Sequence, residues 1–221
     1  MHPNKKILLL GATGRTGKEV LGLALDKGYV VHALVRSPNK VPFKSPNLRI
    51  FQGDTRNSDD VRKALDGVDA VVSCLNISRK NDFPWSPLRT PPDFLSASMM
   101  TLLQVAKERQ LNRLVFTSAW GVGDSRPFIP GWFAWFIDNS NISTAYLEHE
   151  RQEALVKGSE IDWTIVRPVG LTNSQRSKPV RVFLENQGKP SLTVSRFDTA
   201  RFLLDTLEDG KYIKQVPVIS H

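Results

Sequence analysis

The chain has little cysteine and no long hydrophobic run. Cys74 is the only cysteine among 221 residues, which excludes an intramolecular disulfide. No stretch approaches the roughly 18 consecutive apolar residues of a transmembrane helix. The first residues pass from two lysines directly into a short apolar run, without the cleavage site of a secretory leader. We therefore expect a soluble, cytoplasmic protein with no membrane partner.

Histidines and clustered charges are also scarce. The four histidines, at positions 2, 32, 149 and 221, do not have the spacing of metal ligands, so no metal site is predicted. The 30 basic residues exceed the 22 acidic ones and give a formal net charge of +8. They are scattered, and no block of five or six occurs, so we do not expect nucleic-acid binding.

Strand-like and helix-like segments alternate along the first three quarters of the chain. Strands are expected at 5–10, 29–35, 48–53, 69–75, 113–118 and 163–168, and helices at 15–27, 58–65, 93–109 and 143–157. Ser58 or Asp59 is expected to cap the second helix. This alternation predicts an α/β protein, a doubly wound parallel sheet of the Rossmann type, in a single domain over 1–221.

Two segments interrupt or follow this alternation. Residues 119–142 are rich in glycine, proline and aromatic residues without a clean period, which predicts a loop with a short helical piece beside the ligand crevice. The segment 169–221 holds β-like runs at 180–184, 191–195 and 216–220 and a helix at 198–207. It is too short for its own core, so we expect it to close the substrate side of the same domain.

A glycine-rich corner follows the first strand in the stretch ILLLGATGRTGK, residues 7–18. A phosphoryl-transfer loop would need glycine at position 12 and serine or threonine at position 19, where the chain has Ala12 and Glu19. Gly11, Gly14 and Gly17 instead fit the strand-to-helix turn that binds a dinucleotide pyrophosphate at a helix N-terminus. A bound dinucleotide is therefore expected.

The end of the second strand selects between the two nicotinamide cofactors. NAD sites usually carry an acidic residue here for the ribose 2′-hydroxyl, whereas this chain has Arg36 and Ser37. Arginine can pair with a 2′-phosphate and stack on adenine, although it can also be an ordinary exposed residue. With Arg15 inside the glycine loop, NADP(H) is favoured over NAD(H).

Several motifs together resemble one known family. They are GATGRTGKEV (11–20), ALVRS (33–37), QGD (52–54), DAVVSCL (69–75), LVFTSAW (114–120), HERQEALVKGSEIDWTIVRP (149–168) and LENQGKPSLTVSRFDTARFLLDTL (184–207). In order and spacing they are similar to the atypical short-chain dehydrogenase/reductase group that includes the NmrA-like proteins. Within that group they most resemble the NADPH-dependent flavin reductases of the biliverdin reductase B type. The resemblance covers almost the whole chain.

The resemblance implies a set of cofactor-binding residues. For the pyrophosphate they are Gly11, Thr13, Gly14, Arg15, Thr16 and Gly17; for the 2′-phosphate Arg36 and Ser37; for adenine Asp54 and Thr55; for the nicotinamide ribose Cys74, Leu75 and Asn76; and for the nicotinamide amide Pro168, Val169 and Gly170. These residues fall at the carboxyl ends of predicted strands, where open α/β sheets bind ligands.

The expected catalytic residues are fewer. Tyr146 is followed four residues later by Glu150, so the conventional Tyr-x-x-x-Lys pair of short-chain dehydrogenases is absent. Ser118 could donate a hydrogen bond to the acceptor, or bond to its own backbone. His149 holds the place of a histidine in the resembling reductases and is a proton-donor candidate, or else a solvated helix residue. Cys74 is interpreted as strand core.

The aromatic residues of the insert 119–142 suggest a substrate wall. Trp120, Trp132 and Trp135, with Phe133 and Phe136, could stack on a planar acceptor such as an isoalloxazine or a tetrapyrrole. The alternative interpretations are packing of the insert on its own body or a dimer patch. We expect a monomer or a weak homodimer.

Three functional hypotheses remain. The first is an NADPH-dependent reductase that transfers hydride to a flavin or another planar conjugated acceptor. The second is a non-catalytic, NADP-sensing regulatory protein of the NmrA-like kind, which the missing tyrosine–lysine pair keeps open. The third and weaker one is a sugar-nucleotide epimerase or dehydratase, against which that missing pair and the short C-terminal segment argue.

Overall fold

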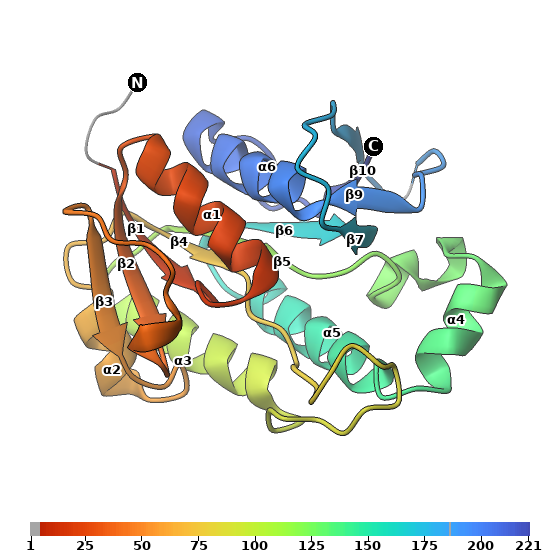
Figure 1. The fold of residues 1–221 in the computed structure, drawn as a ribbon, viewed down its shortest axis with the longest axis horizontal. Coiled ribbons are helices and arrows are strands. Elements are labelled where there is room, and N and C mark those ends of the chain that lie inside the picture. Colours follow the sequence, from red (N-terminus) through yellow and green to blue (C-terminus); the bar gives the residue numbers. More distant parts are fainter. Residues whose placement is uncertain (1–4, 186) are drawn as a thin grey trace.

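A computed structural model describes residues 5–185 and 187–221 (Figure 1). Its centre is an eight-stranded sheet in the order β3-β2-β1-β4-β5-β6-β10-β8. The strands are β1 (Lys6–Leu10), β2 (Val30–Val35), β3 (Leu48–Gln52), β4 (Ala70–Ser73), β5 (Arg113–Thr117), β6 (Asp162–Pro168), β8 (Arg181–Phe183) and β10 (Val218–Ser220). All neighbours pair in parallel except β10 and β8. The first six strands have the doubly wound Rossmann order, so the predicted fold class is confirmed.

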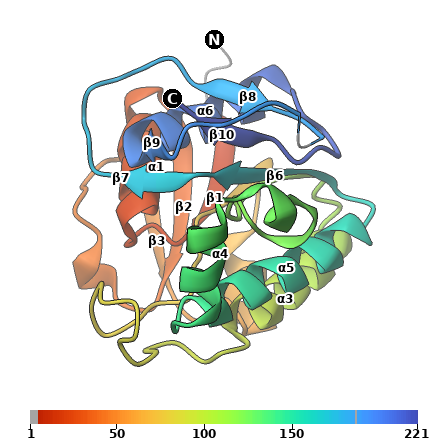
Figure 2. The same cartoon turned by 90° about the vertical axis from the view of Figure 1, so that its right-hand side faces the viewer.

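Helices cover both faces of this sheet (Figures 1 and 2). One face carries α1 (Arg15–Asp26) and α6 (Arg196–Asp209), and the other carries α2 (Ser58–Ala64), α3 (Phe94–Glu108) and α5 (Ser143–Lys157). Along β1, Ile7 and Leu9 join the core under α1 and α6, while Leu8 and Leu10 join the opposite core. Burial on both sides explains why the strand reads as a continuous apolar run.

The helix start predicted at Ser58 or Asp59 differs in one respect. The cap of α2 is Asn57, whose side-chain oxygen accepts hydrogen bonds from the backbone amides of Asp59 at 2.9 Å and Asp60 at 3.1 Å. Asn57 has the extended backbone of a capping residue, so Ser58 is already the first helical residue. The prediction of Ser58 or Asp59 was therefore wrong by one or two residues, because the helix begins directly after Asn57.

The insert 119–142 folds as a short 3₁₀ segment, η2 (Gly123–Phe128), followed by α4 (Gly131–Asp138). The predicted short helical piece is therefore present, and it lies in front of α5 when the molecule is viewed from its right-hand side (Figure 2). A second 3₁₀ segment, η1 (Pro38–Lys40), follows β2. The β-like runs of the C-terminal segment shorten to three residues each because only those residues pair with neighbouring strands.

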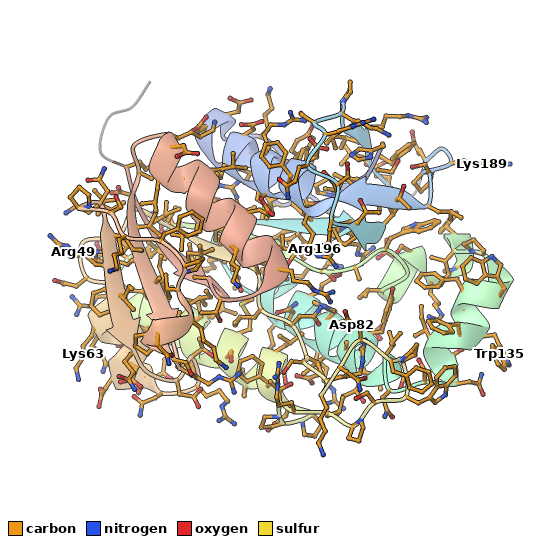
Figure 3. The ribbon with its side chains drawn as sticks, viewed as in Figure 1. Arg49, Lys63, Asp82, Trp135, Lys189 and Arg196 are labelled. Carbon is orange, nitrogen blue, oxygen red and sulfur yellow. The ribbon has the colours of Figure 1, made fainter. Side chains whose placement is uncertain are left out.

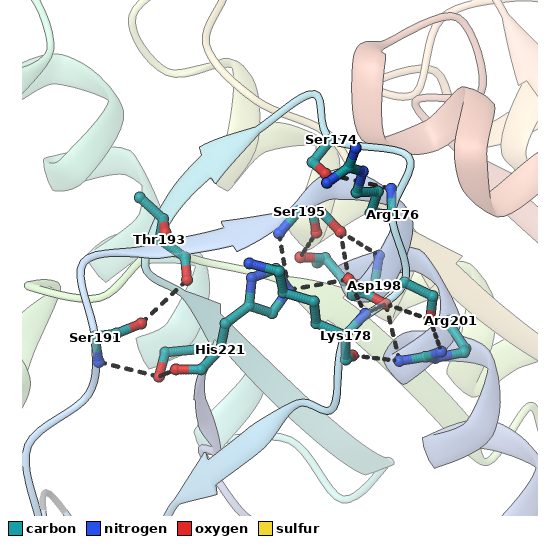
Figure 4. Close-up of polar contacts among 12 residues, drawn as sticks. Ser174, Arg176, Lys178, Ser191, Thr193, Ser195, Asp198, Arg201 and His221 are labelled. Carbon is teal, nitrogen blue, oxygen red and sulfur yellow. Dashed lines mark hydrogen bonds and ion pairs between the residues drawn. The ribbon is translucent and has the colours of Figure 1, made fainter.

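A small parallel pair, β7 (Gly170–Thr172) with β9 (Thr193–Ser195), connects β6 to α6. It is held by Asp198, whose carboxylate accepts hydrogen bonds from Ser195 Oγ at 2.6 Å and from the Lys178 amide, and pairs with Arg201 at 2.8 Å (Figure 4). His221 Nε2 lies 3.0 Å from the same carboxylate. Burial opposes ionisation of Asp198, but these hydrogen bonds outweigh it and lower its pKa.

This cluster of serine, aspartate and histidine is an anchor and not a nucleophile. In a hydrolytic triad the histidine lies between the serine and the carboxylate. Here Ser195 donates directly to Asp198, and both residues are fully buried. The cluster therefore fixes the 174–178 loop, the start of α6 and His221 to one another.

Candidate functional site

A cleft of about 550 Å³ runs along the carboxyl ends of the parallel strands and continues into a second cavity of about 230 Å³. The two share Asn76, Ile77, Arg79, Ser118, His149, Pro168, Leu171 and Arg196. Open α/β sheets bind their ligands at this edge. The larger cleft passes the glycine corner and reaches Arg36, whereas the smaller cavity lies against the insert.

Two glycines of the glycine corner, Gly11 and Gly17, leave no room for a side chain. Gly11 has a φ of +83°, and a Cβ there would lie 2.7 Å from the Cys74 carbonyl oxygen. A Cβ on Gly17 would lie 2.0 Å from the Gly11 carbonyl oxygen. Gly14 is the N-cap of α1 and supplies no side-chain cap. The first amides of α1 are therefore left for an anion, which fits a pyrophosphate.

The end of the cleft where the adenosine is expected is lined by Arg36, Thr55 and Phe94. The guanidinium groups of Arg36 and Arg56 lie 5.7 and 5.9 Å from the centre of the Phe94 ring. Asp54 is held by Arg56, with Oδ2 and Nη2 2.7 Å apart, and this bond lowers the pKa of its carboxyl group. Phe94 lines the cleft from α3 and was not predicted from the sequence, and Arg56, from the loop before α2, lies over its ring without lining the cleft.

Three further charged residues line the cleft, two from helix starts and one from a loop. Arg15 pairs with Asp82 across the opening at 3.0 Å, and Arg196 lies near Arg15; Figure 3 shows Asp82 and Arg196 near the centre of the molecule. Burial and the charge of Arg15 lower the pKa of Arg196. Arg15 and Arg196 each occupy the first turn of a helix, where a cation opposes the helix dipole. This unfavourable position of a cation at the start of a helix was the one sequence signal that could have identified Arg196 as a site residue.

Arg79 is the least satisfied of these cations. Its Nε is buried without a hydrogen-bond partner in the described structure, and the residue lines both cavities. A buried guanidinium nitrogen without a partner is costly, which favours a ligand group at this position.

Ser118 follows the last residue of β5 and lines both cavities, but its hydroxyl proton already forms a hydrogen bond within the protein. Its Oγ lies 2.6 Å from Glu153 Oε1. Glu153 also receives two hydrogen bonds from Arg167, at 2.9 and 2.6 Å, and Arg167 pairs with Asp124 at 2.8 Å. Burial opposes ionisation of Glu153, but the bonds from Arg167 and Ser118 outweigh it and lower its pKa. Because an ionised carboxylate only accepts, Ser118 must be the donor.

His149 is buried in the cleft wall, which contradicts the alternative of a solvated helix residue. Burial lowers its pKa to about 4, against the opposing charges of Glu153 and Glu148, so the ring is neutral near pH 7. Its Nδ1 lies 2.7 Å from Gln152 Nε2. With the Gln152 amide assigned as donor, the ring proton lies on Nε2.

Two other titratable groups of the cleft are also neutral. Burial raises the pKa of Tyr146 to about 12, and its hydroxyl donates to the Trp120 carbonyl at 3.3 Å. Burial raises the pKa of the Cys74 thiol to about 12 as well. Neither group is poised as a nucleophile or as an ionised base at neutral pH.

The structure brings only one of the three predicted tryptophans to the cavities. Trp120 is buried and lines the smaller cavity with Phe133 and Tyr146. Trp132 and Trp135 are 65% and 63% exposed and line neither cavity, and Trp135 projects at the edge of the molecule (Figure 3). The structure does not bring them to the cavities, because α4 packs through Ile137 and turns these two positions outward, so their contact with a substrate stays a prediction.

The predicted cofactor residues divide into three groups. The larger cleft is lined by Gly11, Thr13, Gly14, Arg15, Thr16, Arg36, Thr55, Cys74, Leu75, Asn76 and Pro168. Val169 and Gly170 line the smaller cavity, and Gly17, Ser37 and Asp54 line neither. Among the described residues no three metal-ligating side chains cluster, and His2 lies outside them. No helix in the described ranges has the length and apolarity of a membrane span.

The fold and the cleft define a Rossmann protein for a nicotinamide dinucleotide. Residues 11–210 match the NAD(P)H-binding family, and the chain belongs to that family. The predicted membership of a nicotinamide-cofactor family is thereby confirmed at the level of NAD(P)H binding. A short-chain dehydrogenase/reductase of Veillonella parvula in complex with NADP superposes with a TM-score of 0.82 at 15% identity, over 98% of this chain and 94% of the other.

Two further proteins are similar to this chain. ChuY, an anaerobilin reductase of Escherichia coli O157:H7, superposes with a TM-score of 0.80 at 20% identity, over 97% of this chain and 96% of the other. The photosystem II assembly factor Ycf39 of Synechocystis is 23% identical over 97% of this chain and 62% of its own length. The chain spans about three fifths or less of the length of the first curated relatives it matches.

Proposed function

We propose that the protein is an NADPH-dependent reductase that transfers hydride to a planar conjugated acceptor such as a flavin or a linear tetrapyrrole. The observation that carries this proposal is one continuous cleft with two different ends. The glycine corner and Arg36 lie at one end, and the aromatic cavity of Trp120 and Phe133 lies at the other. The nicotinamide cofactor would supply the hydride when bound.

The charges at the adenosine end support NADP(H) over NAD(H). Arg36 and Arg56 lie on the Phe94 ring, Ser37 follows Arg36, and no acidic residue occurs between positions 30 and 41. A 2′-phosphate would gain charge-assisted hydrogen bonds there, whereas an unphosphorylated ribose would find no carboxylate.

The acceptor end supports a flat and anionic molecule. Trp120, Phe133 and Tyr146 offer ring surfaces, and Arg79 and Arg196 bring positive charge to the same cavity. Flavin nucleotides and linear tetrapyrroles combine both properties, and ChuY, named an anaerobilin reductase, has the same fold. Neutral His149 is no imidazolium donor, so the proton that accompanies the hydride would come from solvent.

The decisive measurement is NADPH oxidation at 340 nm with FMN, FAD, riboflavin, quinones and linear tetrapyrroles, each compared with NADH. We expect turnover with at least one flat acceptor and a preference for NADPH. Tight NADPH binding without turnover on any acceptor would remove the reductase proposal and leave the second candidate.

That second candidate is an NADP-sensing protein that passes the cofactor state to a protein partner. The exposed rings of Trp132 and Trp135 favour it, because they belong to the same insert whose Trp120 and Phe133 line the smaller cavity. So does the resemblance to Ycf39, which is named an assembly factor. It predicts partner association that depends on NADP(H) and is unchanged by Ser118→Ala, measured by pull-down with and without cofactor.

A further inference from the structure

Ser118 and His149 together offer a hydrogen-bond acceptor beside a hydrogen-bond donor. Both side chains line both cavities, and both are buried in the protein wall. His149 and Glu153, the partner of Ser118, are one turn apart on the same face of α5. Both groups therefore line the region that the two cavities share.

The polarity of each group is fixed by its buried neighbour. A serine hydroxyl has one proton and two lone pairs. Glu153 takes the proton of Ser118, so only lone pairs remain for the cleft. Gln152 occupies Nδ1 of His149, so the proton on Nε2 remains as a donor.

We propose that Ser118 and His149 recognise the carbonyl and N–H edge of an amide or lactam, with Ser118 Oγ accepting from the N–H and His149 Nε2–H donating to the carbonyl oxygen. Such an edge occurs in the pyrimidine ring of a flavin, in the terminal rings of a linear tetrapyrrole and in the carboxamide of nicotinamide. The inference rests on the proposed function for the first two sources and is independent of it for the third.

Glu153 is in this view a positioning residue. Its Oε2 faces two cations, Arg167 Nη2 at 2.6 Å and Lys157 Nζ at 3.1 Å, whereas its Oε1 faces Ser118 and Arg167 Nε. In Glu153→Gln the single amide oxygen would turn toward the two cations. The amide N–H would then point at Ser118, whose own proton would be released into the cleft.

The acceptor arm of the test compares lumiflavin with N3-methyl-lumiflavin, which keeps both carbonyl oxygens and carries a methyl group in place of the N–H. Binding to the protein with NADP⁺ is measured by flavin fluorescence, and kcat/KM is measured with NADPH. We expect the wild type to prefer lumiflavin by about tenfold, the value of one neutral hydrogen bond. Ser118→Ala and Glu153→Gln should remove this preference.

The matched control is Glu148→Gln. Glu148 is an equally buried glutamate on α5, but it binds Ser96 and Arg151 and lines neither cavity. Both glutamate variants should lower the thermal midpoint, whereas only Glu153→Gln should change the preference between the two flavins.

The cofactor arm compares NADP⁺ with its 3-acetylpyridine analogue, which has the carbonyl but no N–H, by isothermal titration. If the wild type prefers NADP⁺ and Ser118→Ala removes that preference, Ser118 and His149 recognise the nicotinamide carboxamide. If Ser118→Ala instead removes the preference for lumiflavin, they recognise the acceptor. If Ser118→Ala changes neither preference, the inference is wrong. Absence of turnover on every acceptor of the panel, with an intact result in either binding arm, would refute the reductase proposal alone.

Discussion

The two ends of the cleft are built in different ways. At the glycine corner the backbone makes the site, because Gly11, Gly14 and Gly17 lie within seven residues and leave amides free at the start of α1. At the acceptor end side chains make the site, and Ser118, Glu153 and Arg167 come from β5, α5 and β6. The glycine corner therefore depends on neighbouring residues in the sequence. The acceptor end forms only when β5, α5 and β6 have packed together.

The largest expected effect tests the backbone end. Gly17→Ala would place a Cβ 2.0 Å from the Gly11 carbonyl oxygen, so α1 must separate from β1. We expect a loss of more than about 3 kcal/mol of unfolding free energy, measured by urea denaturation. Gly131→Ala is the matched control, because no atom lies within 4 Å of its added Cβ. Equal stability of the two variants would contradict the close contact.

The next effect tests the side-chain end through pH. His149 has a pKa of about 4 in the folded protein, below its ordinary value of 6.5, so between these pH values the unfolded chain binds more protons. The contribution of neutral His149 to the unfolding free energy is therefore complete above pH 6.5, and the unfolding free energy falls by about 3 kcal/mol as the pH drops to 4. His149→Gln should flatten the unfolding free energy over that range. An unchanged slope would mean that His149 is not buried as a neutral ring.

A smaller effect tests cofactor choice at the backbone end. Arg36→Leu should weaken NADPH binding by about 10- to 100-fold and leave NADH binding nearly unchanged, because only NADPH carries the 2′-phosphate. Arg49→Leu removes an equal charge from β3 outside the cleft and serves as control. Fluorescence titration of both cofactors measures the effect. If Arg36→Leu weakened the binding of NADH and NADPH equally, Arg36 would not contact the 2′-phosphate.

The smallest effect concerns the ion pair between Arg15 and Asp82 at the cofactor cleft. Asp82 lies 3.0 Å from Arg15 and competes with a pyrophosphate for that guanidinium, so Asp82→Asn should tighten NADPH binding by about two- to fivefold. Asp66→Asn, which removes the partner of Arg109 at the surface, should not change it. Weaker binding of NADPH to Asp82→Asn would show that Asp82 supports the site.

The sequence predicted the backbone end well and the side-chain end poorly, for a physical reason. Glycine spacing, strand ends and Arg36 are local signals that a turn and a sheet edge require. The partners of Ser118 are not local, since Glu153 and Arg167 are separated from it by 35 and 49 residues, and only the fold shows that its proton is used. Exposure of Trp132 and Trp135 likewise depends on how α4 packs, which its uniformly apolar sequence did not reveal.

The single cysteine has a practical consequence. Maleimides and similar reagents attack thiolates, and the Cys74 thiol, with a pKa of about 12, is almost entirely protonated near neutral pH. A cysteine introduced at the exposed position of Trp135→Cys would therefore be labelled selectively without first removing the natural one. A fluorophore placed there would report directly on whether α4 meets a partner when NADP(H) binds.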